Sequence, residues 1–282
     1  MNIRQTRALQ GTSFRPMPKD GEVRQQNREL LAALDELRRA NEVKTRFLSN
    51  MAHEFRTPLA SILSLARLLT DRVDGELTPE QERQVNYIRR SADSLLELVN
   101  DLLDLAEVEA GKVRIRAARF SAGDLLGAVR GMLRPLLAPS SALTLVFEDA
   151  ASVPDLETDE GKVSQILRNF VSNALKFTER GEVRVSATHD GDGFVRFTVA
   201  DTGIGIAAED HERVFEEFGQ VEHPIQKLVR GTGLGLPLSR KLADLLGGRI
   251  VLESEVGRGS SFSLVVPIKY SGPVENTTSQ PF

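Results

Sequence analysis

The sequence predicts a multidomain protein in which an all-α helical hairpin, forming a dimeric four-helix bundle, is followed by an α/β sandwich domain. Two observations predict this fold class. From Val23 to Gly111, apolar residues recur every three or four positions, as they do on one face of an α-helix. Beyond Gly111, short runs of alternating apolar and polar residues, typical of strands, are mixed with helical runs. A chain of 282 residues is long enough for two ordinary domains.

The composition is that of an average globular protein and excludes several classes of function. Hydrophobic residues make up 40% of the chain and charged residues 27%. The net charge of −4 gives no basic field for nucleic acid or anionic membrane. Because cysteine is absent, disulfides, thiolate metal sites and a cysteine nucleophile are excluded. No apolar run reaches the roughly 20 residues of a membrane span, and no signal peptide is visible. We expect a cytoplasmic protein, or the cytoplasmic portion of a larger one.

The first long helix is expected to begin at Val23. The preceding residues 1–22 are polar and lack periodicity, so we expect them to be disordered. One apolar seam runs from Leu30 to Leu69 with a spacing of three to four residues. The helix should end within residues 71–77, where Gly, Asp and Arg break the pattern.

The second helix has clear start and stop signals. Thr78 is expected to be its N-cap, with Pro79 at the first helical position and Gln81 completing a capping box. Gly111 ends it. The short connection predicts an antiparallel hairpin with the first helix. Two helices cannot bury so much apolar surface alone, so we predict a homodimer.

The region after Gly111 is predicted to be a layered α/β sandwich rather than a doubly wound sheet, because its helices and strands alternate irregularly. The expected elements, in order, are a strand over 112–120, a helix over 121–137, a strand over 143–149, a helix over 159–178, a hairpin over 182–201, a helix from about 234 to 246 and a hairpin over 249–268.

His53 is the first candidate for chemistry. It lies within SNMAHEFRTPLAS, residues 49–61, and points about 200° away from its neighbours on the apolar seam, into solvent. Thr57 is nearly in line with it one turn later, and Glu54 is adjacent. Neutral imidazole is a competent nucleophile that a carboxylate can orient. Pro58 has no N–H and could bend the helix here. A surface histidine without a role is the alternative.

A second group of candidates lies on the predicted helix over 159–178. Asn169, Asn173 and Lys176 are spaced i, i+4 and i+7, and therefore share one face. A carboxamide oxygen is a suitable ligand for Mg²⁺, and a lysine supplies a point charge for phosphate. Each of these residues alone could equally serve as a cap or surface residue.

Glycine-containing segments follow in the second half of the chain. Asp201 ends a predicted strand just before Gly203 and Gly205, where a carboxylate could accept a hydrogen bond from an exocyclic amine while the glycines admit a flat base. The segment GTGLGL, residues 231–236, precedes a helix whose free N–H groups favour anions. No P-loop motif is present in the chain.

Taken in order, these motifs resemble the catalytic core of bacterial sensor histidine kinases over about residues 25–268. FLSNMAHEFRTPL is similar to the H-box of that family and QILRNFVSNALKF to its N-box. DTGIG, VFEEF, GTGLGL and GRGSSF are similar to its G1, F, G2 and G3 boxes. The resemblance implies a dimerisation and phosphotransfer hairpin followed by an ATP-binding domain of the gyrase and heat-shock chaperone type.

The resemblance implies a role for each matching residue. His53 would accept the γ-phosphoryl group of ATP, with Glu54 as base and orienting group. Thr57 matches the position that aligns water for dephosphorylating the response regulator. Asn173 would bind Mg²⁺, and Asp201 would bind the adenine amine. The other residues implied to bind or enclose ATP are Asn169, Lys176, Gly203, Gly205, Phe215, Phe218, Gly231, Thr232, Gly233, Leu234, Gly235 and Leu236, with the two phenylalanines anchoring a lid.

On this resemblance we expect four segments: a disordered extension over 1–22, a coiled coil and phosphotransfer hairpin over 23–111, a catalytic domain over 112–270 and a flexible tail over 271–282. The implied partners are a second copy of the chain, the receiver domain of a response regulator and a separate sensor protein, since no sensor domain is visible. Two alternatives are a catalytically silent scaffold that binds a regulator and a gyrase- or chaperone-like ATPase.

Overall fold

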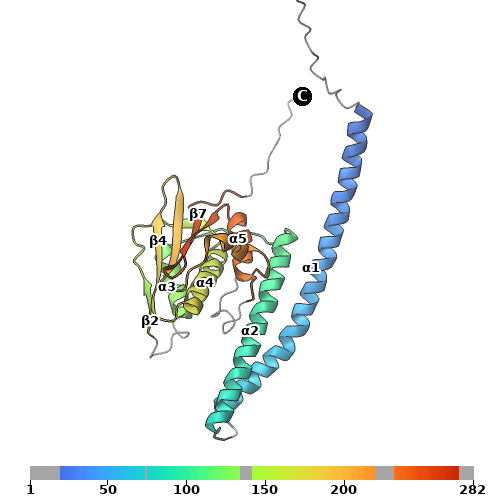
Figure 1. The fold of residues 1–282 in the computed structure, drawn as a ribbon. Coiled ribbons are helices and arrows are strands. Elements are labelled where there is room, and N and C mark those ends of the chain that lie inside the picture. The colour runs from blue at the N-terminus through green and yellow to red at the C-terminus, as the bar shows by residue number, and fades with distance from the viewer. Residues whose placement is uncertain (1–19, 74, 134–141, 220–231, 273–282) are drawn as a thin grey trace, which may run out of the picture. The chain divides into compact units, whose positions relative to one another are not determined.

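The structure, a computed structural model, describes residues 20–73, 75–133, 142–219 and 232–272, and for residues 20–24 the backbone alone. It contains two long helices followed by a mixed α/β region (Figure 1). Among the helices in these residues, none combines the length and apolar character that crossing a membrane requires.

Helix α1 extends over Asp20–Thr70 and continues through Pro58 as one helix. The end of the helix agrees with the prediction, but its beginning does not, because residues 20–22 are helical rather than disordered. The rest of the predicted extension, residues 1–19, lies outside the described residues.

Helix α2 extends over Pro79–Glu109 and begins as predicted. Thr78 Oγ1 accepts a hydrogen bond from the Gln81 N–H at 3.3 Å, while Gln81 Oε1 accepts one from the Thr78 N–H at 2.9 Å. Gly111 follows the last turn with a positive φ of 64°, as a helix-ending glycine does. The capping box and the glycine stop are therefore confirmed.

Within a single chain, the hairpin buries one of its two apolar stripes. Hydrogen bonds between the helices include those from Thr45 Oγ1 to the Ala106 carbonyl at 3.4 Å and from Arg56 Nη2 to Asn100 Oδ1 at 3.0 Å. The residues of the buried stripe recur every seven positions and are Thr45, Ala52, Leu59 and Ala66 on α1 and Val85, Ala92, Val99 and Ala106 on α2. Leu105 of α2 is also buried, and belongs to the core of the α/β region. The second stripe consists of Phe55, Ile62, Leu69, Ile88 and Leu95, each 40–50% exposed.

The α/β region is built on a five-stranded sheet. Its strands, in spatial order, are β2 (Leu143–Phe147), β4 (Gly181–His189), β5 (Phe194–Asp201), β7 (Gly259–Pro267) and β6 (Arg249–Glu255). The β2–β4 pair is parallel and the other pairs are antiparallel. Two short strands, β1 (Ala118–Phe120) and β3 (Leu156–Thr158), form a separate antiparallel pair. The main sheet was predicted except for the order of its strands.

Helices α4 (Glu160–Phe177) and α5 (Gly235–Leu245) pack on this sheet and α3 (Ala122–Leu133) packs against α4, giving the predicted layered α/β sandwich (Figure 1). Their apolar faces and alternate residues of β4 and β5 form one buried core. Its aromatic centre is Phe170, whose ring lies 5.4 Å from that of Phe262, which in turn meets Phe215 edge-on at 6.4 Å.

Several predicted elements are corrected. The strand over 112–120 is limited to β1, because the Arg116 N–H donates to Asp159 Oδ2 at 2.8 Å instead of to a neighbouring strand. The short strand β3 and two 3₁₀ helices, Ala208–Asp210 and Arg213–Phe215, were not predicted. The helix predicted over 121–137 is described only as far as Leu133.

Candidate functional site

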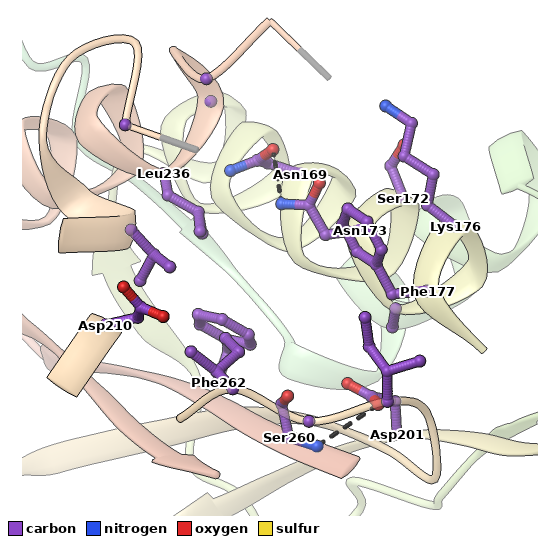
Figure 2. A pocket seen from close by; sticks show the side chains of 18 of the residues that line it. Asn169, Ser172, Asn173, Lys176, Phe177, Asp201, Asp210, Leu236, Ser260 and Phe262 are labelled. Carbon is purple, nitrogen blue, oxygen red and sulfur yellow. Dashed lines mark hydrogen bonds between the residues drawn. The ribbon is translucent and has the colours of Figure 1, made fainter. Parts of the chain in front are cut away.

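A cavity of about 370 Å³ lies between α4, the end of β5 and the beginning of α5. Figure 2 shows Asn169, Asn173 and Lys176 along one helix, with Asp201 and Phe262 on the other side of the cavity. The predicted site residues that line it are Asn169, Asn173, Lys176, Asp201, Gly205, Thr232, Gly233, Gly235 and Leu236. Residues from three separate sequence motifs therefore meet around one space.

Other predicted site residues do not line this cavity. Gly203 lies behind Asp201, while Phe215 and Leu234 are buried in the core. Phe218 has a 62% exposed side chain, and its backbone N–H donates to the Gly233 carbonyl at 3.0 Å. Gly231 lies outside the described residues, as do residues 220–230, on which the prediction of a lid depends.

The amide pair on α4 is oriented by hydrogen bonds. Asn169 Nδ2 donates to Ser239 Oγ of α5 at 2.9 Å, and Asn169 Oδ1 accepts from Asn173 Nδ2 at 3.3 Å (Figure 2). The oxygen of the Asn173 amide is consequently the end that faces away from Asn169. A Cβ at Gly235 would lie 2.3 Å from Asn169 Oδ1, so only glycine allows α5 to begin this close to the pair.

Asp201 lies at the opposite end of the cavity and is held by backbone donors. Its Oδ1 accepts from the Gly203 N–H at 2.8 Å and from the Ser260 N–H at 3.3 Å. Both bonds use the same oxygen, so Oδ2 is the atom that could accept a hydrogen bond from a ligand. Burial raises the pKa of the Asp201 carboxyl, and these two N–H groups and the Thr178 hydroxyl partly oppose the effect.

Sequence reasoning missed part of the cavity wall. Ser260 and Phe262 lie within the GRGSSF motif, but neither was assigned a position in the site. The strand register accounts for their positions: Phe262 pairs with Val199, and Ser260 therefore lies beside Asp201. The remaining apolar lining comes from loop and helix-end positions that carry no periodic signal, namely Phe177, Ile204, Ile206, Val214 and Val256.

Two carboxylates of α2, Glu97 and Asp101, also line the cavity and were not predicted. Asp101 Oδ2 accepts a hydrogen bond from Thr232 Oγ1 at 3.4 Å. Burial, with the nearby charges of Glu97 and Asp104, raises the pKa of Asp101 to about 6, against the opposing effects of the Thr232 hydroxyl and the Lys176 ammonium. The ionised form of this side chain is therefore less favourable here than in water.

Further polar contacts join α2 to the α/β region. Lys241 Nζ of α5 bonds Glu109 Oε1 at 2.5 Å and Glu217 Oε1 at 3.2 Å. Gln165 Nε2 of α4 donates to Asp104 Oδ2 at 2.6 Å. Together with the bond between Thr232 and Asp101, these contacts form what we term the α2 clasp.

The histidine site lies on α1, apart from the cavity. His53, Glu54 and Thr57 are all exposed, so the predicted outward direction of His53 is confirmed. Thr57 Oγ1 lies 3.4 Å from the His53 carbonyl and donates to it. None of the three lines the cavity. The histidine and the cavity are thus separate sites in this conformation.

Two known families match the chain, one over the region of His53 and the other over the region of the cavity. Residues 43–111 match the His Kinase A (phospho-acceptor) domain. Residues 158–270 match the histidine kinase-, DNA gyrase B- and HSP90-like ATPase family.

Curated relatives extend over both domains. The sensory/regulatory protein RpfC of Xanthomonas campestris pv. campestris is 38% identical over 258 residues, which cover 89% of this chain and 35% of the relative. The circadian input-output histidine kinase CikA of Synechococcus elongatus is 37% identical over 250 residues, covering 88% of this chain and 33% of CikA. The chain spans about one third of the length of these relatives.

A solved structure gives the same result. Full-length ShkA in complex with AMPPNP superposes with a TM-score of 0.64 and 36% identity, covering 80% of this chain and 46% of ShkA. The Acinetobacter baumannii histidine kinase AdeS, at 20% identity and a TM-score of 0.51, shares the fold. The chain therefore belongs to the sensor histidine kinase family of two-component systems.

Proposed function

We propose that the chain is a catalytic core that uses ATP to phosphorylate His53 and passes the phosphoryl group to an aspartate of a partner response regulator. One observation carries the proposal: the cavity gathers an amide pair, a lysine and a carboxylate around a space in the size range of ligand sites. ShkA, which shares this fold, was solved with the ATP analogue AMPPNP.

The two ends of the cavity differ in chemistry, which sets the direction of ATP. Asp201 Oδ2 would accept from the adenine amine, beside the ring of Phe262. Lys176 and the N-terminus of α5 at Gly235 would face the phosphates, because both are electropositive.

The residues at the phosphate end fit a magnesium ion. The Asn173 amide turns its nitrogen toward Asn169, which leaves its oxygen, a hard neutral ligand, as the donor. A bound Mg²⁺ would neutralise charge on the phosphates.

In the proposed transfer, a ring nitrogen of His53 forms a bond to the γ-phosphorus of ATP. The bond from that phosphorus to the β–γ bridging oxygen breaks, and ADP leaves with the electron pair. Glu54, next in sequence and equally exposed, would orient the imidazole and accept its proton. Because His53 does not line the cavity, the nucleotide domain must move, or reach the histidine of a second copy.

We further propose that the chain acts as a homodimer. The half-exposed stripe of Phe55, Ile62, Leu69, Ile88 and Leu95 has the heptad spacing of a bundle interface. A second hairpin would bury it and complete four helices. The separate unit that ends at Lys44 exposes Leu30, Leu34 and Leu37, through which a sensor protein could act.

The exposed surface around His53 is where a receiver domain would dock. Thr57, one turn from His53, would align water when the regulator is dephosphorylated. Since the reaction requires ATP, we propose a cytoplasmic location, either alone or as the cytoplasmic portion of a larger sensor.

The test is incubation with Mg²⁺ and γ-labelled ATP, comparing the native chain with His53→Gln and Asn173→Ala. We expect acid-labile, base-stable label in the native chain only, with nucleotide binding retained by His53→Gln. His53→Gln leaves the cavity unchanged and is therefore the control for nucleotide binding.

Two other outcomes would support the alternatives. Tight ATP binding without labelled protein would support a scaffold. Phosphate release that His53→Gln leaves unchanged would support an ATPase of the gyrase or chaperone type.

A further inference from the structure

We propose that the α2 clasp is an autoinhibitory contact, in which Asp101 occupies groups that ATP phosphates would otherwise take, so that clasp formation and ATP binding oppose each other. The inference rests on the proposed function for the identity of the ligand. It adds a regulatory role for a carboxylate face of α2 that the proposed reaction does not use.

The contacts of Asp101 are those expected of a phosphate group. Its carboxylate accepts a hydrogen bond from Thr232, in the glycine segment at the start of α5. It also lies within the electrostatic influence of Lys176, the lysine that we assign to the phosphates. An anionic side chain from α2 therefore accepts a hydrogen bond from one group that an anionic ligand would need, and lines the same cavity as a second, Lys176.

The carboxylates of α2 and the phosphates of ATP carry charge of the same sign and repel each other. Glu97 and Asp101 both line the cavity, and Asp104 lies one further turn along α2. Adding the negative charge of a triphosphate beside these carboxylates is unfavourable in a partly buried site. ATP would consequently bind better after α2 has withdrawn.

The other members of the clasp hold α2 in place without lining the cavity. Lys241 bridges Glu109 of α2 and Glu217, which follows the 3₁₀ helix Arg213–Phe215. The 2.6 Å bond between Gln165 and Asp104 fixes α4 to the same helix. Lys241 is therefore a site at which the clasp can be weakened without changing any group that would contact ATP.

The first experiment measures Mg²⁺–ATP binding by calorimetry in the full chain. The apparent Kd rises as the binding-competent fraction falls, so weakening a clasp formed nine-tenths of the time tightens binding by up to about tenfold. We expect tighter binding in Asp101→Asn, and also in Lys241→Met. The control is Glu82→Gln, which removes an exposed carboxylate from the first turn of α2 and should leave Kd unchanged.

The outcomes separate the two proposals. If Asp101→Asn and Lys241→Met bind ATP no more tightly than the native chain, the clasp is not autoinhibitory, although the proposed function stands. If neither the native chain nor any variant binds ATP, the proposed function fails, and this inference fails with it.

A second experiment tests the clasp without changing the cavity charges. The chain has no cysteine, so Asp104→Cys and Gln165→Cys can be introduced together and joined by a short bismaleimide. The internally cross-linked chain should bind ATP more weakly than the same variant capped with N-ethylmaleimide. Equal affinities would overturn the proposal.

Discussion

The helical hairpin and the nucleotide domain differ in how much of their apolar surface a single chain covers. In the nucleotide domain, Phe170, Phe197 and Leu264 are each 0% exposed, and the sheet and its helices close around them. In the hairpin, Phe55 remains 50% exposed and Leu95 46%. One region completes its own core, whereas the other presents an apolar stripe along its length.

This difference corresponds to the two tasks that the proposed phosphotransfer reaction sets. A nucleotide site needs fixed distances, such as those that place Asn169 against Gly235, and a closed core maintains them. A phospho-acceptor helix must remain accessible to the kinase domain and to a regulator, and His53 is exposed accordingly. The apolar stripe beside it is then available to a second copy of the chain.

The largest effect should come from removing an aromatic ring from the closed core, with removal of a ring from the apolar stripe as the comparison. Phe170→Ala leaves a cavity beside Phe262 and should lower the free energy of unfolding of the nucleotide domain by about 3–5 kcal/mol. Phe55→Ala should leave that domain unchanged, because Phe55 lies on the half-exposed stripe. Urea titration, followed by hydrogen exchange of the amides in β4–β7, measures the free energy of unfolding of the nucleotide domain in both variants. Equal losses would show that the two regions share one cooperative core.

The next effect concerns the open stripe. Ile62→Glu places a charge at the proposed dimer interface and should shift the chain to monomers in sedimentation velocity, with ATP binding retained. Ser64→Glu adds the same charge about 200° around the helix at an exposed position, and is the matched control. If Ile62→Glu sediments like Ser64→Glu, the stripe is not the interface.

The same contrast shows which parts of the fold sequence patterns can predict. Helices α1, α2 and α4 were predicted because their periodicity extends over many turns, and the α2 cap depends on residues only three apart. The strand over 112–120 was mispredicted because its backbone bond to Asp159 involves a residue more than forty positions away. β3 has only three residues, too few for an alternation to be recognised.

The residues of the candidate site also differ in whether sequence patterns can predict them. Asn173 and Lys176 were identified because one helix face carries them, and Asp201 because glycines follow it. Asp101 was missed because it reaches the cavity from α2, where its spacing is that of any solvent-exposed acidic residue. The same limit applies to Lys241, whose two partners lie 132 and 24 residues away.

A smaller effect is expected at Gly235, where the nucleotide site requires a residue without a side chain. Gly235→Ala would bring a methyl group to 2.3 Å from Asn169 Oδ1 and displace the amide pair. We expect ATP affinity to fall about tenfold, equivalent to about 1.4 kcal/mol, by calorimetry. Gly127→Ala in α3 is the control, because its Cβ meets nothing within 4 Å. It should stabilise the domain by about 0.4–1 kcal/mol without changing affinity.

The smallest effect should come from the start of α2, where the hairpin depends on local chemistry. Thr78→Ala removes the acceptor for the Gln81 N–H and should lower hairpin stability by about 1 kcal/mol. Thr78→Ser keeps the hydroxyl and should be close to neutral. Hydrogen exchange at the first turn of α2 provides the measurement. If Thr78→Ser exchanges as fast as Thr78→Ala, the methyl group rather than the cap stabilises this end of the helix.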